Sequence, residues 1–226
     1  MKREAVTGFV LAGGKSTRMA PGMANDRDKA QIRLAAGGPT LLETALAAIR
    51  AVAGEVFILE SAERYGAYGE AVADIFPGCG PLGGIHAALS RTKTEFNLII
   101  GVDTPFLSPA LLGYIVDRAL GEEDVRGKNV AQEKHDAQQR RLVTAPVIDD
   151  YPQPLCAVYS REFLPVAEQA LRDGRYKIVP LFTPERTLLI PEAELRQFAF
   201  TAEMFENLNT PEDLERARRR HADRNP

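Results

Sequence analysis

Apolar residues follow two alternating patterns in the first half of the chain. Short, nearly continuous apolar runs cover residues 5–11, 56–59 and 96–102, and such runs are typical of strands buried on both faces. Between them, apolar residues recur at helical spacing over residues 41–52 and again over residues 84–89. Because strands that alternate with helices indicate βα units, we expect an α/β fold with a mainly parallel central sheet flanked by helices.

Two further helices are marked by residues typical of helix starts. Ser108 is followed by a proline, which predicts a helix from there to about residue 119. Near the end of the chain, Thr210, Pro211 and two acidic residues predict a helix that finishes in the arginine-rich segment 216–220.

The pattern after the first 120 residues is less regular. Residues 121–141 carry charges of both signs and few apolar side chains, which predicts a long exposed loop. An apolar run over residues 155–159 predicts a strand, and helical spacing returns near residues 162–171.

Composition narrows the kind of protein and its surroundings. A chain of 226 residues, 45% of them hydrophobic, is long enough for a single domain over residues 1–226. The net charge of −3 gives no electrostatic reason to expect nucleic acid as a partner. Its apolar runs are too short to span a membrane, and its N-terminus has no signal-peptide pattern. Cys79 and Cys156 fit neither a disulfide framework nor a zinc site, so we expect a cytoplasmic protein.

A glycine-rich loop follows the first predicted strand, with the sequence Leu-Ala-Gly-Gly-Lys-Ser-Thr-Arg-Met over residues 11–19. Gly13 and Gly14 allow the backbone to turn sharply and expose amide groups to an anion, while Lys15 and Arg18 add positive charge. The spacing differs from that of a P-loop and of a dinucleotide-binding fingerprint. Because ligands bind at the carboxyl ends of strands in open sheets, the pattern favours a phosphate-binding loop over an ordinary turn.

Two aspartates are candidate functional residues beside that loop. Asp103 ends a predicted strand, so it can hold Mg²⁺ against bound phosphates or simply serve as a cap. Asp74 precedes a run in which Gly83 and Gly84 permit close approach to a ligand and open a helix. A purely structural loop is the alternative explanation for this second run.

Several motifs in the same order resemble those of the molybdenum cofactor guanylyltransferases. The resemblance covers about residues 5–120 and 142–216. It is carried by the glycine-rich loop followed by Asp28-Lys29, Gly-Pro-Leu-Gly-Gly at 80–84, Asp-Thr-Pro-Phe at 103–106, Pro-Leu-Cys-Ala-Val-Tyr at 154–159, and Asn-Leu-Asn-Thr-Pro-Glu-Asp-Leu at 207–214.

The resemblance implies a Rossmann-like nucleotidyltransferase fold and a Mg²⁺-dependent reaction. In the reaction that it implies, GMP would pass from GTP to the phosphate of molybdopterin, and pyrophosphate would be released. Residues 1–120 would bind the nucleotide and residues 142–226 the acceptor, in a monomer or a weak homo-oligomer. GTP is expected rather than CTP, because cytidylyl relatives more often carry Ala at the position of Gly13.

Residue roles follow from the same resemblance. The expected catalytic residues are Lys15, Arg18, Lys29 and Asp103, with Asp103 as the metal ligand. The expected nucleotide-binding residues are Leu11, Ala12, Gly13, Gly14, Lys29, Asp74, Gly83 and Asp103. Asn207 and Asn209 are expected to hold the pterin, although Asn209 is also suited to a turn before a helix. Residues 20–27 form an insertion relative to the family, and we expect it to close over the phosphates of a bound nucleotide.

Three other functions stay open at this point. The chain could use CTP on the same pterin, or it could be a nucleotidyltransferase for a sugar phosphate or for 2-phospholactate. From a different class, it could be a nucleotide-binding regulator without catalysis. Retention of Lys15, Arg18, Lys29 and Asp103 favours an enzyme over the regulator.

Overall fold

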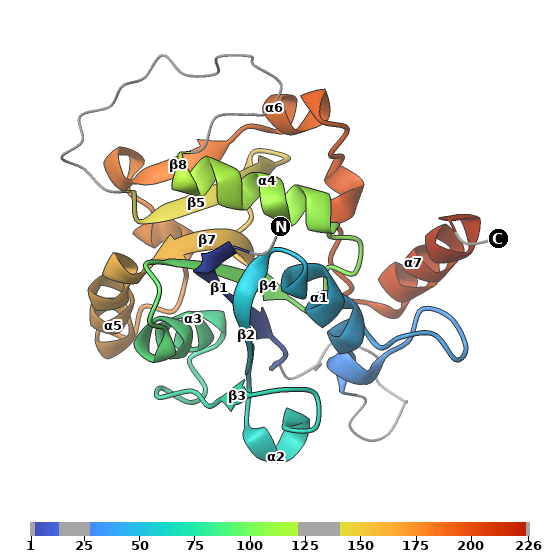
Figure 1. Cartoon of the computed structure of the whole chain (residues 1–226), viewed down its shortest axis with the longest axis horizontal. Coiled ribbons are helices and arrows are strands. Elements are labelled where there is room, and N and C mark those ends of the chain that lie inside the picture. Colours follow the sequence, from blue (N-terminus) through green and yellow to red (C-terminus); the bar gives the residue numbers. More distant parts are fainter. Residues whose placement is uncertain (1–2, 14–27, 122–140, 225–226) are drawn as a thin grey trace.

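The computed structural model describes residues 3–13, 28–121 and 141–224, and among these eight strands form one sheet (Figure 1). The strand order is β3-β2-β1-β4-β7-β5-β6, and β8 pairs with β5. The strands are β1 (Arg3–Leu11), β2 (Ala53–Leu59), β3 (Ala71–Val72), β4 (Phe96–Gly101), β5 (Val143–Ile148), β6 (Tyr151–Pro152), β7 (Cys156–Ser160) and β8 (Thr187–Ile190). The helices are α1 (Leu41–Arg50), α2 (Ala62–Tyr65), α3 (Pro81–Arg91), α4 (Pro109–Leu120), α5 (Leu164–Arg172), α6 (Glu192–Gln197) and α7 (Pro211–Arg224). Short 3-10 helices are η1 (Lys29–Gln31), η2 (Arg161–Phe163), η3 (Val179–Leu181), η4 (Pro184–Arg186) and η5 (Ala202–Phe205).

The sheet is parallel in its first half and largely antiparallel in its second. Strand β1 pairs in parallel with both β2 and β4, and β2 pairs in parallel with β3. Strand β7 then runs antiparallel to β4 and to β5, whereas β8 is parallel to β5. The predicted α/β fold is confirmed, and the strands of the regular βα pattern, β1, β2 and β4, pair in parallel.

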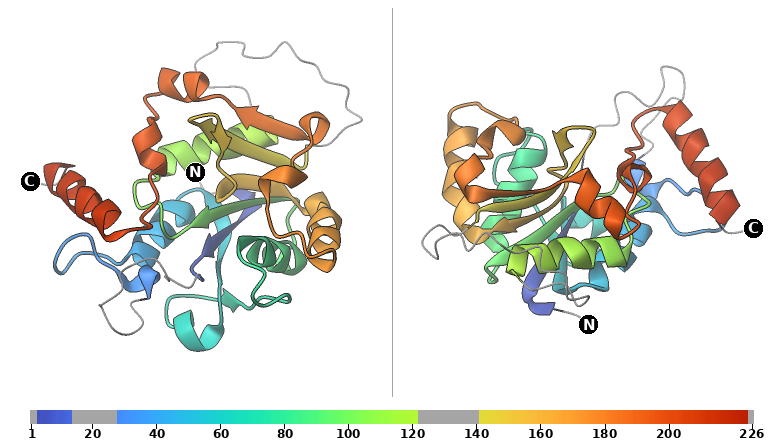
Figure 2. Two further views of the ribbon diagram at one scale, coloured as in Figure 1. Left: turned by 180° about the vertical axis from the view of Figure 1, so that it is seen from behind. Right: turned by 90° about the horizontal axis from the view of Figure 1, so that it is seen from above.

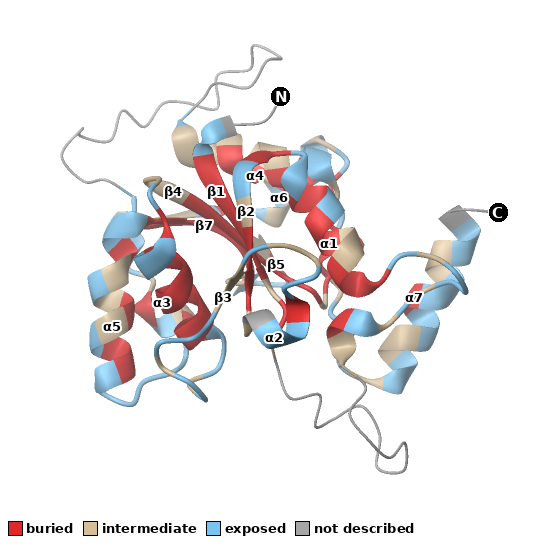
Figure 3. Cartoon of the chain, turned by 60° about the horizontal axis from the view of Figure 1, so that its bottom comes forward, coloured by how far each residue is buried: buried red, intermediate tan, exposed pale blue. Residues whose placement is uncertain are grey.

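Helices cover both faces of the sheet, and one hydrophobic cluster lies on each side (Figure 2). Successive residues of β1 serve opposite faces, since Val10 belongs to the cluster under α1 and α4 and Phe9 to the cluster under α3 and α5. Figure 3 shows these inner helix faces and the central strands as buried. The near-continuous apolar runs of the sequence are therefore explained by burial on both sides.

The predicted helix starts are confirmed at three places. Thr40 caps α1 in a reciprocal capping box with Glu43, and the hydroxyl of Ser108 accepts a hydrogen bond from the amide of Leu111 in α4. Thr210 stands at the start of α7 and accepts a hydrogen bond from the amide of Asp213.

Several predicted boundaries were wrong, among them the start of β2, which begins at Ala53 and not at residue 56. Helix α3 begins at Pro81, not at residue 84, because proline is favoured in the first turn of a helix. Helix α7 does not finish within residues 216–220 but continues to Arg224, since no helix-breaking residue interrupts that run.

Two segments for which the sequence makes predictions lie wholly or largely outside the described residues. The loop predicted over residues 121–141 is described only at its two end residues. The insertion at residues 20–27, and with it Gly14, Lys15 and Arg18, also lies outside the described residues. Within the part that is described, no helix has the length and apolar character needed to cross a bilayer.

Candidate functional site

Three neighbouring parallel strands end side by side and set the edge of the candidate site. Leu11 of β1 pairs with Leu59 of β2 on one side and with Gly101 of β4 on the other. The amide of Val102 donates to the carbonyl of Leu11 at 3.2 Å, so the alignment continues past the strand end. The residues that follow these strands therefore gather at one edge of the sheet, which is where open α/β sheets bind ligands.

Asp103 is placed at this edge by its neighbours. A side chain at Gly101 would put its Cβ 2.5 Å from Asp103 Oδ1, so the carboxylate would have to shift from its position over the strand end if this residue were not glycine. The backbone carbonyl of Asp103 accepts a hydrogen bond from the amide of Leu208 at 2.9 Å. The side chain stays 22% exposed, so it can still reach a ligand.

Three predicted site residues, far apart in sequence, meet at this point. Lys29 Nζ donates to Asp103 Oδ2 at 3.2 Å and to Asn209 Oδ1 at 3.0 Å. Lys29 comes from η1, Asp103 from the loop after β4, and Asn209 from the segment before α7. The structure thus brings a lysine predicted for the phosphates against the carboxylate predicted for the metal.

Asp28 anchors the short segment that carries Lys29. Its Oδ1 accepts from the amide of Ala30 at 3.1 Å and caps η1. Its Oδ2 accepts from the hydroxyl of Tyr65 and lies 3.5 Å from Arg64 Nε. Burial, followed by the hydrogen bond to Asp28, raises the pKa of Tyr65, which keeps its hydroxyl protonated and able to donate.

A second group of polar residues lies around the glycine loop. A Cβ at Gly13 would sit 2.6 Å from Glu60 Oε2, so the carboxylate of Glu60 lies against the described start of the loop. Partial desolvation, helped by the negative charge of Glu60, raises the pKa of Asp74. Arg64 joins this group to the first, because its guanidinium lies 3.7 Å from Glu60 and 3.5 Å from Asp28.

The glycines of α3 shape its packing against this group. A Cβ at Gly83 would lie 2.9 Å from the carbonyl oxygen of Phe76 and 3.5 Å from Asp74 Oδ2. A Cβ at Gly84 would overlap Leu11 of β1. The amide of Gly83 donates to the carbonyl of Gly80 within the first turn, so glycine here serves close packing and close approach.

The remaining predicted residues have clear places. Ala12 is buried and Leu11 is half-buried at the end of β1. Asn207 and Asn209 flank the buried Leu208 and are both exposed, but only Asn209 has a contact with Lys29 among the described residues.

Sequence reasoning missed three residues of this region, namely Glu60, Arg64 and Tyr65. The position of Glu60, directly after a buried parallel strand, was the one signal that could have indicated it. Arg64 and Tyr65 belong to the four-residue helix α2, which is too short to give a periodic pattern.

Asp103 offers a single carboxylate that suits magnesium. No cluster of three or more His, Cys, Asp or Glu side chains able to hold a metal occurs within residues 3–13, 28–121 and 141–224. Mg²⁺ usually binds through one or two carboxylates together with water and substrate phosphates, not in an all-protein cage. A single accessible carboxylate at the ligand edge of the sheet fits that mode.

The chain is similar to known proteins over most of its length. Over 94% of its length the chain is 31% identical to a probable molybdenum cofactor guanylyltransferase from Pelotomaculum thermopropionicum, of which it covers 91%. It is 32% identical to a molybdenum cofactor guanylyltransferase from Desulfosudis oleivorans, with 95% of each chain covered. Among solved structures, molybdopterin-guanine dinucleotide biosynthesis protein A from Archaeoglobus fulgidus is similar with a TM-score of 0.75 and 25% identity, over 96% of this chain and 99% of that one.

A second solved structure is less similar in sequence, and this similarity shows the fold alone. The 2-C-methyl-D-erythritol 4-phosphate cytidylyltransferase from Thermus thermophilus has a TM-score of 0.60 at 16% identity, over 95% of this chain and 98% of that one.

Residues 8–184 match the family described as the MobA-like NTP transferase domain. The chain belongs to this family and is a nucleotidyltransferase.

Proposed function

We propose that the protein transfers GMP from GTP to the terminal phosphate of molybdopterin and releases pyrophosphate. One observation supports this most directly: Lys29 and Asp103 meet within 3.2 Å at the edge of the sheet where the glycine loop begins. A lysine beside a carboxylate at that edge suits a triphosphate with its metal ion. The names of the similar proteins agree with this choice of nucleotide and acceptor.

The reaction is a displacement at the α-phosphorus of GTP. An oxygen of the acceptor phosphate forms the new bond, and the bond from the α-phosphorus to the oxygen bridging it to the β-phosphate breaks. The second ionisation of a phosphate monoester lies near pH ~6, so the nucleophile is largely a dianion at neutral pH. No general base is therefore required of the chain.

The chain would act by positioning and by neutralising charge. Asp103 would hold Mg²⁺, which supplies positive charge at the phosphate oxygens. Lys29, together with Lys15 and Arg18, would stabilise the negative charge that develops on the leaving pyrophosphate. The ammonium group of Lys29 donates to Asp103 and Asn209, and the side chain is 16% exposed, so a ligand can still reach it.

The nucleotide and the acceptor would each contact a different set of residues beside Lys29 and Asp103. The proposed nucleotide contacts are Leu11, Ala12, Gly13, Gly14, Asp74 and Gly83, in addition to Lys29 and Asp103. Asn207 and Asn209 would contact the pterin from the segment before α7. Their exposure leaves the amide groups accessible to such a ligand.

A pyrophosphate-release assay tests the proposal. The protein with Mg²⁺ and molybdopterin should release pyrophosphate with GTP, and less with CTP, UTP or ATP. Omitting the pterin should abolish the release. Asp103→Ala should lower turnover by at least ~100-fold, the scale of losing one electrostatic stabiliser. Release that continues without the pterin would indicate a nucleotide hydrolase instead, and no release with any nucleotide would refute the proposal.

A further inference from the structure

Lys29 carries a long, flexible side chain whose position is set from the C-terminal part of the molecule. A lysine ammonium group can only donate hydrogen bonds, so the amide of Asn209 must present its oxygen to it. The two atoms are 3.0 Å apart and the two residues are 180 positions apart in sequence. Lysine has much rotamer freedom, and a second acceptor beside Asp103 restricts it.

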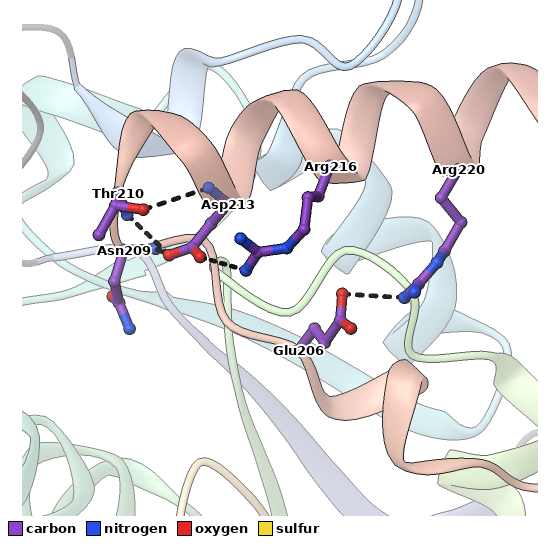
Figure 4. A network of polar contacts seen from close by, with 6 residues as sticks. All are labelled: Glu206, Asn209, Thr210, Asp213, Arg216 and Arg220. Atoms are coloured by element: carbon purple, nitrogen blue, oxygen red, sulfur yellow. Dashed lines mark hydrogen bonds and ion pairs between the residues drawn. The ribbon is translucent and has the colours of Figure 1, made fainter.

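Asn209 is itself held in place by the start of α7. The carboxylate of Asp213 accepts from the backbone amides of Asn209 and Thr210 at 2.9 and 2.8 Å, while the Thr210 hydroxyl accepts from the amide of Asp213 (Figure 4). The other carboxylate oxygen of Asp213 accepts from Arg216. This reciprocal capping fixes both the helix start and the backbone of Asn209.

The start of α7 is also fixed to the rest of the site. Leu208 donates its amide to the backbone of Asp103, and its side chain is buried with Leu41, Phe106 and Ala217 of α7 in a small hydrophobic cluster. Arg220 of α7 donates to the carboxylate of Glu206 at 2.9 Å, which ties the preceding segment to the helix (Figure 4). Asn209 therefore faces Lys29 from a rigid support.

We propose that Asn209 is a positioning residue for nucleotide binding, acting through Lys29. The C-terminal helix would thus contribute to GTP affinity even though the family match ends at residue 184. The inference builds on the proposed function, because it takes the nucleotide phosphates as the partner of Lys29. It is compatible with a pterin contact, since the amide nitrogen of Asn209 is a separate donor.

Affinity for GTP without the pterin separates the two roles. Isothermal titration with GTP and Mg²⁺ should give a dissociation constant about tenfold higher for Asn209→Ala than for wild type, the scale of one hydrogen bond to a charged group. Glu212→Gln is the control substitution, because Glu212 is exposed in the first turn of α7 and has no part in the proposed site, and it should leave the affinity for GTP alone unchanged. If Asn209 only contacted the pterin, neither substitution would alter this constant.

A double-mutant cycle shows whether the effect passes through Lys29. Lys29→Ala should weaken GTP binding strongly in wild type, and adding it to N209A should bring the affinity to that of K29A and no lower. Equal melting temperatures for wild type and N209A would exclude a loss of folding as the cause.

Each outcome decides something different. Unchanged GTP affinity in N209A, or losses that simply add in the double variant, would overturn the inference. GTP binding that depends on Asn209 without any transfer to the pterin would sustain the inference and defeat the proposed function. A wild-type protein that binds none of the four nucleoside triphosphates would overturn both.

Discussion

Residues at the edge of the sheet affect the candidate site in two ways. Some carry functional groups, and others, being small, leave room for the side chains of their neighbours. Gly101 is the clearest case, because a Cβ there would lie 2.5 Å from an oxygen of the Asp103 carboxylate. The carboxylate that we assign to the metal is thus positioned by a residue with no functional group. Sequence patterns do not reveal this, since a glycine within an apolar strand has several possible explanations.

We expect Gly101→Ala to lower turnover by at least about tenfold by displacing Asp103, because small misplacements at a reacting centre are costly. Gly113→Ala in α4 is the matched control, since its Cβ would lie 3.7 Å from Val52, at ordinary van der Waals distance. That variant should keep full turnover. Steady-state kinetics of both variants checks the expectation, and normal turnover in G101A would show that Asp103 does not depend on this glycine.

His86 is a buried histidine of α3 whose Nδ1 has no hydrogen-bond partner among the described residues. Burial lowers the pKa of His86, Glu168 partly opposes this, and Arg172 adds to it. As the pH falls below ~6.5, His86 takes up a proton in the unfolded chain before it does so in the folded chain. Stability therefore falls with pH until the lowered pKa of the folded state is reached, by up to ~1.4 kcal/mol per pH unit for one group.

The substitution His86→Leu should therefore flatten this part of the pH dependence. Urea unfolding of both proteins at pH 7.5 and pH 5.5 gives the comparison, and all other titrating groups are common to the two. A wild-type protein that loses no more stability than the variant between these values would contradict the assignment.

At the scale of elements, the first half could be predicted because its patterns agree with one another. Helix α1 has a capping residue and an apolar face, and β1 and β4 each contain a nearly continuous apolar run. In the second half, β5 contains Pro146, which argues against a strand in sequence reasoning, and β8 has only four residues. These two segments form strands because they pair with neighbouring strands of the sheet. Such pairing between distant segments cannot be predicted from the local sequence.

Tyr65 links helix α2 to η1, and we infer that this link helps to position Lys29. The buried hydroxyl of Tyr65 donates to Asp28, the residue that caps η1 next to Lys29. Tyr65→Phe should weaken GTP binding about three- to tenfold and lower stability by about 1 kcal/mol, since it leaves Asp28 without this donor.

Tyr68→Phe is the matched control for this change. The hydroxyl of Tyr68 donates to the exposed Gln31 at 3.0 Å, where water can replace it. Titration with GTP and thermal unfolding of both variants should therefore show a clear effect in Y65F and little in Y68F. Equal effects would mean that the Asp28 anchor has no special part in placing Lys29.

For the whole molecule, the candidate site is assembled from segments that lie far apart in sequence. Asp103 and Lys29 were predicted through motifs, and the fold brings them into contact. The contact of Lys29 with Asn209 could not be predicted, because it depends on how α7 docks beside η1. Glu60 was missed because it is a single residue after a strand, and Tyr65 because its helix is too short to give a periodic pattern.

The central claim is guanylyl transfer to a pterin phosphate, and the identity of the product tests it most directly. The protein should be incubated with molybdopterin, Mg²⁺ and equal concentrations of GTP and CTP, and the products separated and identified by mass spectrometry. We predict a dinucleotide of molybdopterin and GMP, with one pyrophosphate released for each molecule formed. A product containing CMP, or nucleotide consumption without any dinucleotide, would contradict the claim.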